Sequence, residues 1–173
     1  MIQAYKNYWK NYTNFKDRTS VSGYWWVVVA NFLASFVIGF IAGIIAAVMG
    51  INSVELADDY SNLREYLASP ENVITSVWSL VNIIPGLAIS FRRLHDTNRS
   101  GWLLFVPYAI IGSSIAGIIF VAISGTDAEK VISGLITVIF LLGIVLTVYY
   151  IVLLVFFCSK SVNEGNRYGD KQV

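Results

Sequence analysis

The residues best suited to chemistry form one short motif, Arg92-Arg93-Leu94-His95-Asp96-Thr97-Asn98-Arg99-Ser100-Gly101-Trp102. It holds three arginines, an aspartate and the only histidine of a chain in which 13% of the residues are charged. Histidine titrates near neutrality, so His95 beside Asp96 could act as an acid–base pair. Adjacent residues on a helix point about 100° apart and need not touch, so a histidine that orders the loop is the alternative.

The arginines allow two interpretations. They are expected to close one helix shortly before Ser100 opens the next, and a helix N-terminus attracts anions. A sharp turn at Thr97-Asn98 would bring both groups to one site suited to a phosphate or a lipid headgroup. In the structural alternative, Arg92 pairs with Asp96, Arg93 extends to the membrane surface, and the arginines only set topology. The candidate anion-binding residues are Arg18, Arg92, Arg93, His95, Asp96, Arg99 and Arg167.

Other site chemistries find little support in the sequence. One histidine and the distant Cys158 do not make a metal-ligand set, and we predict neither a metal nor a cofactor. The chain contains no phosphate-binding glycine loop and no GxSxG serine motif. A single cysteine excludes an intramolecular disulfide.

Long uncharged stretches indicate how these residues are positioned. The chain is 56% hydrophobic and 13% charged, whereas a soluble domain usually has about 25% charged residues. Four stretches without charge each reach the roughly 20 residues that a membrane-spanning helix needs. We therefore predict an all-α membrane protein with one membrane domain over residues 1–173. The expected spans are about 24–49, 70–91, 101–123 and 131–157, followed by a polar, partly mobile cytoplasmic tail over 158–173.

Lysine and arginine counts predict the orientation of these spans. Alternate sides carry ten and two of these residues, and the positive-inside rule assigns the richer side to the cytoplasm. Both termini and the His95 loop are then cytoplasmic. The richer side holds Lys6, Lys10, Lys16, Arg18, Arg92, Arg93, Arg99, Lys160, Arg167 and Lys171, and the other side holds Arg64 and Lys130.

Residues 1–22 are predicted to form an amphipathic N-terminal segment. Aromatic residues recur at helical spacing from Tyr5 to Phe15, and Lys6 and Lys10 fall mostly on the opposite side. This pattern favours a helix in the headgroup layer, or equally a helix packed on the protein's own segments. The first uncharged run starts too late and is too long for a signal peptide, so we expect it to remain as a membrane anchor.

Small and polar residues predict contacts between the spans. Ser35, Gly39 and Gly43 stand four apart in the first span and form a ridge that a neighbouring helix can approach closely. Asn31, one turn earlier, is expected to face protein.

The second span contains Pro85, where we expect a kink. It also carries a stripe of polar or small residues, which predicts either a water-filled path along the helix or hydrogen bonds between helices. The stripe consists of Thr75, Ser79, Asn82, Gly86 and Ser90.

Residues 52–71 are predicted to form an exposed loop with a short acidic helix, because Leu56, Tyr60, Leu63 and Leu67 recur at helical spacing. Ser69-Pro70-Glu71 indicates the start of the next helix, with a cap, a proline at the first position and an acid in the first turn.

The central motif resembles the signature of YhaH-like small bacterial membrane proteins, domain-of-unknown-function family 805. Phe15-Lys16-Asp17-Arg18-Thr19-Ser20, followed by Tyr24-Trp25, resembles the N-terminal motif of that family, and Asn166-Arg167-Tyr168-Gly169 resembles its C-terminal motif. This chain has Asp17 where the family usually has glycine, and Val21 where it usually has a second arginine. The resemblance implies a multi-pass membrane fold and supplies no established activity.

Three functional hypotheses follow. The first is a non-enzymatic protein of the bacterial cytoplasmic membrane whose basic face binds anionic lipid or an acidic partner. The second is a small oligomeric transporter or channel, although no charge lies within a predicted span beyond Glu71 at the start of the second. The third is a lipid-modifying enzyme that uses His95 and Asp96. The expected partners are membrane lipids, a second copy of the chain or another membrane protein, and not nucleic acid.

Overall fold

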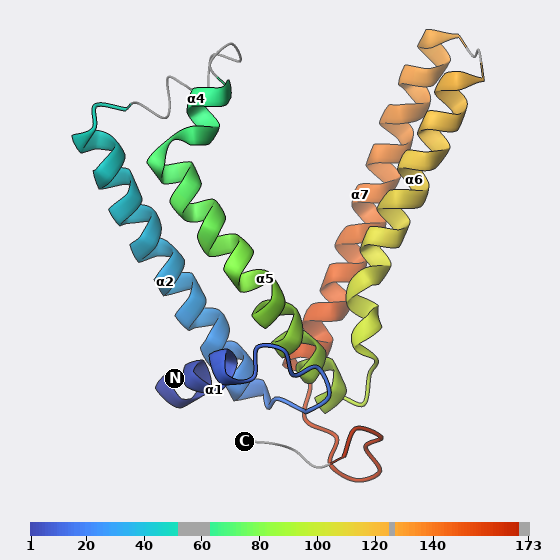
Figure 1. Ribbon diagram of the computed structural model, residues 1–173. Helices are drawn as coiled ribbons and strands as arrows, with labels where there is room; N and C mark the ends of the chain where they lie inside the picture. The colour runs from blue at the N-terminus through green and yellow to red at the C-terminus, as the bar shows by residue number, and fades with distance from the viewer. Residues whose placement is uncertain (52–62, 125–126, 170–173) are drawn as a thin grey trace. The chain divides into compact units, whose positions relative to one another are not determined.

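The computed structural model describes residues 1–51, 63–124 and 127–169, and the elements in these residues are helical. Within these residues, four helical segments are long and apolar enough to cross a membrane, which confirms the predicted all-α membrane class. The described elements are α1 (Ile2–Lys10), α2 (Val21–Val48), α4 (Leu63–Ala68), α5 (Pro70–Asp96), the 3-10 helix η2 (Gly101–Phe105), α6 (Val106–Ile123) and α7 (Ala128–Cys158) (Figure 1).

The helix bounds agree with the predicted spans to within a few residues. The larger difference is at the end of α5, which continues through the first part of the charged motif to Asp96. Pro107 lies in the first turn of α6, where a missing N–H has no consequence, and η2 precedes it. The positions predicted for an acidic helix before residue 63 lie outside the described residues; the part described forms α4.

The chain divides into two compact units, and each is described by itself. Unit 1 contains residues 1–15 and 22–89, and unit 2 contains residues 16–21 and the described part of 90–172. In unit 1, α2 and α5 run side by side (Figure 1). The Trp78 indole Nε1–H donates to the Ser35 hydroxyl at 2.8 Å and joins the two helices. The Ser69 hydroxyl accepts from the Asn72 N–H at 3.4 Å, which confirms the predicted start of α5.

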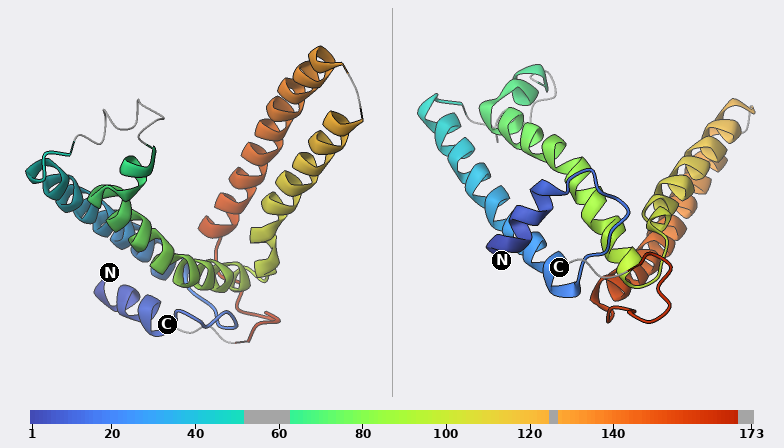
Figure 2. Two further views of the ribbon diagram at one scale, coloured as in Figure 1. Left: turned by 45° about the horizontal axis from the view of Figure 1, so that its top comes forward. Right: turned by 60° about the horizontal axis from the view of Figure 1, so that its bottom comes forward.

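The amphipathic helix α1 lies beside α2 and α5 (Figure 2), and its aromatic side chains contact both helices. Tyr8 is only 2% exposed, and its hydroxyl donates to Asn82 Oδ1 at 2.9 Å. The Tyr5 hydroxyl donates to Asn31 Oδ1 at 3.4 Å, so Asn31 faces protein as predicted. The helix ends at Lys10, and residues 14–20 lie outside the helices. The aromatic face of α1 therefore contacts the protein's own membrane helices.

The predicted small-residue ridge of α2 is only partly used inside the described chain. Ser35 contacts Trp78, whereas a Cβ added at Gly39 or Gly43 would meet no atom within 4 Å. Close helix packing at these two glycines stays a prediction. In the polar stripe of α5, Thr75 and Ser79 donate to carbonyls one turn earlier, and Asn82 contacts α1.

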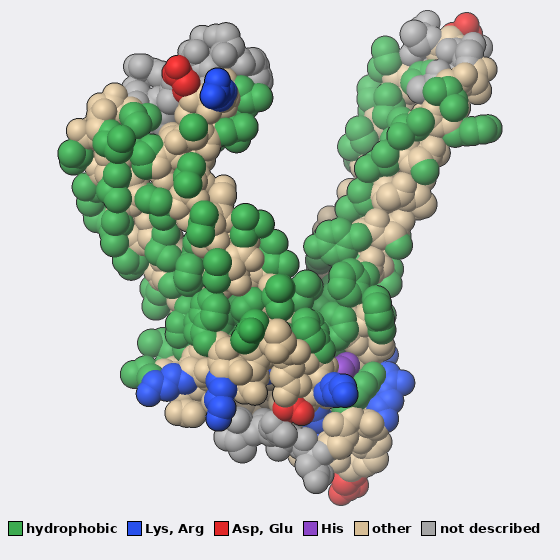
Figure 3. Space-filling view, viewed as in Figure 1, with side chains coloured by type: hydrophobic (Ala, Val, Ile, Leu, Met, Phe, Trp, Pro, Cys, Tyr) green, Lys and Arg blue, Asp and Glu red, His purple; other side chains and the backbone are tan. Residues whose placement is uncertain are grey.

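In unit 2, α6 and α7 form an antiparallel pair (Figure 1). The Tyr149 hydroxyl donates to the Leu103 carbonyl at 2.6 Å, which ties α7 to η2. Apolar side chains cover the shafts of the long helices (Figure 3). That surface is expected of helices whose surroundings are lipid.

The docking of α1 can be tested with Tyr8→Phe. This change removes the hydroxyl that donates to Asn82 and leaves a half-buried amide oxygen without that donor. We expect the chain to lose about 1 kcal/mol of unfolding free energy, measured by denaturation in detergent micelles. Tyr12→Phe is the matched control, because Tyr12 is 50% exposed. Equal stability of the two variants would contradict the docking described for α1.

Candidate functional site

The central motif ends α5 with a tight turn, as predicted for Thr97-Asn98. The Arg99 N–H donates to the Leu94 carbonyl and the Asn98 N–H to the His95 carbonyl, both at 2.9 Å. This pair of bonds is a Schellman motif, and Asn98 takes the left-handed conformation at φ 58°. Asparagine is among the few non-glycine residues that adopt this conformation readily. The turn therefore explains the asparagine in the motif.

Gly101 lets the chain fold back along the last turns of α5. A Cβ at this position would lie 2.0 Å from Cδ1 of Phe91, which no side chain tolerates. The Ser100 hydroxyl accepts from the Trp102 N–H at 3.4 Å and caps η2. The Ser-Gly pair is thus explained by local packing at the start of the third span.

Asp96 is the centre of the site. Its Oδ1 accepts from Arg18 at 3.0 Å, and its Oδ2 accepts from Arg93 and from the Ser161 hydroxyl, each at 2.5 Å. Asp96 and Arg93 are 0% exposed and Arg18 is 2% exposed. Burial of a charge is costly unless the charge is paired and hydrogen-bonded, and here one carboxylate serves two guanidinium groups.

Arg93 also caps the end of α7. Its Nε donates to the Phe157 carbonyl at 2.9 Å, and its terminal nitrogens reach the carbonyls of Phe156 and Ser159. The last carbonyls of a helix have no partner within the helix and need donors from elsewhere. Arg93 supplies them and joins the end of α7 to the end of α5.

Arg18 binds the segment that follows α7. It donates to the Val162 carbonyl at 2.6 Å and to the Gly169 carbonyl at 2.7 Å. The Val162 N–H in turn donates to the Asp96 backbone carbonyl at 2.9 Å. We name the group Arg18, Arg93, Asp96 and Ser161 the arginine clasp. The clasp joins the segment before α2, the end of α5, and the chain at and after the end of α7.

His95 lies beside the clasp and contacts the same segments. Its ring stacks on Tyr168 with centroids 3.7 Å apart and planes 6° apart. Its Nδ1 lies 3.3 Å from the Lys16 carbonyl, and the Asn166 side chain donates to the His95 carbonyl at 3.0 Å. The Asp96 carboxylate contacts arginine and serine side chains, so the two neighbours face different partners. This geometry favours the loop-ordering interpretation of His95 over an acid–base pair.

The seven predicted anion-site residues separate into buried and exposed sets. Arg18, Arg93 and Asp96 meet in the clasp, and His95 and Arg92 are buried beside it at 8% and 5% exposure. Arg99 and Arg167 are exposed, with their guanidinium groups 4.6 Å from the Phe156 ring and 4.9 Å from the Tyr168 ring. Arg18 and Arg93 donate to protein acceptors and Arg92 is buried, so among the arginines of this group only Arg99 and Arg167 have their charge at the surface.

Two parts of the structural alternative are wrong. The i,i+4 partner proposed for Asp96 was Arg92, but the ion pairs of Asp96 are with Arg93, at i,i+3, and with the distant Arg18. Arg93 does not extend to the surface, because helix-end carbonyls hold its guanidinium inside. Helix geometry explains both differences. Residues three and four positions apart on a helix are near neighbours, so spacing alone does not decide whether Arg92 or Arg93 pairs with Asp96 and is held inside.

Sequence reasoning missed the residues that the tail contributes. The tail was expected to be partly mobile, yet Ser161, Asn166 and Tyr168 each contact the motif. The Arg167 N–H also donates to Asn98 Oδ1 at 3.3 Å. One feature of the sequence pointed to the tail. The Asn166–Gly169 segment resembles the C-terminal motif of the family, but the resemblance assigns no role to it. Within the described residues, no three His, Cys, Asp or Glu side chains are placed to hold a metal ion.

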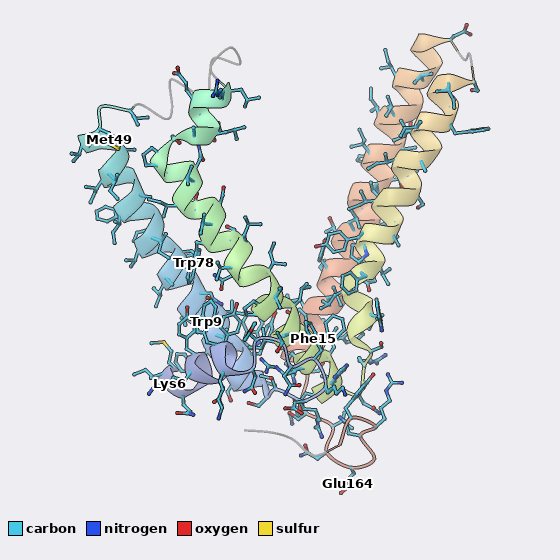
Figure 4. All side chains as sticks on the ribbon, viewed as in Figure 1. Lys6, Trp9, Phe15, Met49, Trp78 and Glu164 are labelled. Carbon is cyan, nitrogen blue, oxygen red and sulfur yellow. The ribbon has the colours of Figure 1, made fainter. Side chains whose placement is uncertain are left out.

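The clasp predicts a large effect of Asp96→Asn. The change keeps the shape of the side chain and removes the negative charge between two buried guanidinium groups. We expect a loss of about 3 kcal/mol or more in unfolding free energy, the range observed when one partner of a buried ion pair is removed. Denaturation in detergent micelles measures it, with Glu164→Gln as control, because Glu164 is exposed on the tail (Figure 4). Similar stability of both variants would show that the carboxylate is dispensable.

Comparison with known proteins finds a matching family model and two inner membrane relatives. A family model described as "Protein of unknown function (DUF805)" matches residues 12–170. Inner membrane protein YhaH of Escherichia coli K12 is 30% identical over 124 residues, which cover 70% of this chain and 85% of YhaH. Inner membrane protein YhaI of the same strain is 27% identical, with 98% of this chain and 94% of YhaI covered. No solved structure matches the chain.

Proposed function

This chain belongs to the DUF805 family, and we propose that it is a non-enzymatic membrane protein whose basic side binds anionic lipid headgroups. It is a multi-pass integral membrane protein, because the described residues contain four helices able to span a membrane and its relatives are inner membrane proteins. The proposal places it in the bacterial inner membrane with both termini and the arginine clasp on the cytoplasmic side.

The division of the arginines carries this proposal. Buried guanidinium groups are used inside the clasp, whereas Arg99, Lys160 and Arg167 are exposed around it. In Figure 3, lysine and arginine side chains gather beside the single histidine of the chain. An exposed cation near an anionic bilayer surface contributes about 1 kcal/mol to binding. The clasp thus acts as a rigid support, and the exposed cations are the part available to a ligand.

Exposed aromatic residues support a position at headgroup level. Trp102 in η2 is 71% exposed and Tyr108 in α6 is 66% exposed, both shortly after Arg99 in the chain. Tryptophan and tyrosine are enriched where a membrane helix passes the interface, because their rings are apolar and their N–H or O–H groups are polar. A cation followed by such rings at the start of a span matches the chemistry of a lipid headgroup above its acyl chains.

The orientation is tested with reporter fusions. We expect a reporter that is active only in the cytoplasm to be active at Val173 and silent when inserted at Asp58, because the lysines and arginines are concentrated on one side. A reporter active only outside the cytoplasm, placed at the same two positions, is the control and should give the opposite pattern. A silent Val173 fusion together with an active Asp58 fusion would reverse the proposed topology.

Lipid binding is tested with the double variant Arg99→Gln/Lys160→Gln. If the two charges act additively, phosphatidylglycerol retention should weaken roughly 30-fold, measured by native mass spectrometry of titrated protein. The charge-preserving Arg99→Lys/Lys160→Arg should retain the lipid, and Arg64→Gln on α4 should have no effect. Substitutions of Arg93 are unsuitable because they would break the clasp.

Phosphatidylcholine is the neutral-lipid control in the same titration. Equal retention of phosphatidylglycerol by the wild type and the double glutamine variant would reject lipid binding by these cations. An unchanged lipid profile combined with loss of a co-purifying acidic protein would instead assign the surface to a protein partner.

A further inference from the structure

The two faces of α1 have different environments. Tyr5, Tyr8 and Trp9 form its inner face, where Tyr8 bonds to Asn82 and the Trp9 ring lies 6.3 Å from that of Trp78. Figure 4 shows Lys6 on the side of α1 away from Trp9 and Trp78. Lys10 follows Lys6 by four residues, about one helical turn, so the two ammonium groups share a face.

This arrangement differs from that of a free interfacial helix in what covers the aromatic face. Such a helix buries its aromatic face in lipid and leaves its basic face toward water and headgroups. In this chain the protein itself covers the aromatic face, because the hydroxyls of Tyr5 and Tyr8 are bonded to amides of α2 and α5. The position of α1 is therefore set by helix packing within unit 1, and its outward face is left to contact the surroundings.

The charge on that outward face is of one sign. Lys6 and Lys10 are exposed, and the sequence contains no acidic residue before Asp17. Lysine stems can lie along apolar surface while the ammonium groups reach the headgroup layer. An anionic bilayer surface complements this face in charge, whereas a second copy of the chain would bring the same lysines into mutual repulsion.

We propose that α1, held on α2 and α5 by its aromatic face, forms a separate binding surface for anionic lipid headgroups through Lys6 and Lys10. The ligand class is that of the proposed function, but this surface lies in unit 1 and does not use Arg99 or Lys160. The attraction is electrostatic, so it weakens as salt increases.

The direct test is Lys6→Gln/Lys10→Gln in the full chain. We expect phosphatidylglycerol retention at this surface to fall roughly 30-fold if the charges are additive, with phosphatidylcholine retention unchanged. Lys6→Arg/Lys10→Arg keeps the charge and should behave like the wild type. Unchanged phosphatidylglycerol retention in the glutamine variant would overturn the inference, even where Arg99→Gln/Lys160→Gln reduces retention. The opposite pattern would reject the Arg99 surface alone.

A labelling experiment tests the orientation of α1 separately. Cys158→Ser removes the only cysteine, and single cysteines are then placed at position 6 or position 8. In permeabilised vesicles, Lys6→Cys should react with a charged maleimide several-fold faster than Tyr8→Cys, because position 8 is covered by α5. Anionic lipid in the vesicles should slow the reaction at position 6. Equal reactivity at both positions, or faster reaction at position 8, would overturn the docked arrangement.

Discussion

A single buried carboxylate organises the charged end of this protein. Asp96 accepts hydrogen bonds from Arg18, Arg93 and Ser161, which come from three different parts of the chain. Two guanidinium groups beside one carboxylate would leave an excess positive charge, and the helix-end carbonyls of Phe156 and Phe157 offset part of it with their dipoles. Removal of the carboxylate would leave buried cations without their counter-charge, so the other contacts depend on it.

The membrane architecture could be predicted from the sequence because it depends on a property of whole segments. No charged residue occurs between Arg18 and Glu55, and the core of a soluble protein does not need so long an uncharged stretch. The turn at Asn98 was also predictable, because few residues adopt its backbone conformation. Both features follow from the chemistry of neighbouring residues, which the sequence displays directly.

The partners within the site could not be predicted in the same way. Arg92 and Arg93 are adjacent and chemically identical, and only the direction in which α5 presents them decides which one meets Asp96. That direction depends on where α7 ends and where the tail returns, and spacing along the chain reports neither. The stacking of Tyr168 on His95, across more than 70 positions, has the same origin. The family resemblance marked all three segments of the site, but it did not reveal that they contact one another.

The clasp also affects the order in which the chain can be assembled. Arg18 precedes the four long apolar helices in the chain, while its acceptors at Val162 and Gly169 follow them. The contacts therefore form only after α7 and the segment that follows it have been synthesised. Until then the early arginine is exposed on the translated segment, where it can help to fix the orientation of the first span. Closure of a loop this long is entropically slow, so we expect it to be a late step in biogenesis, and a chain that ends before Val162 would never complete it.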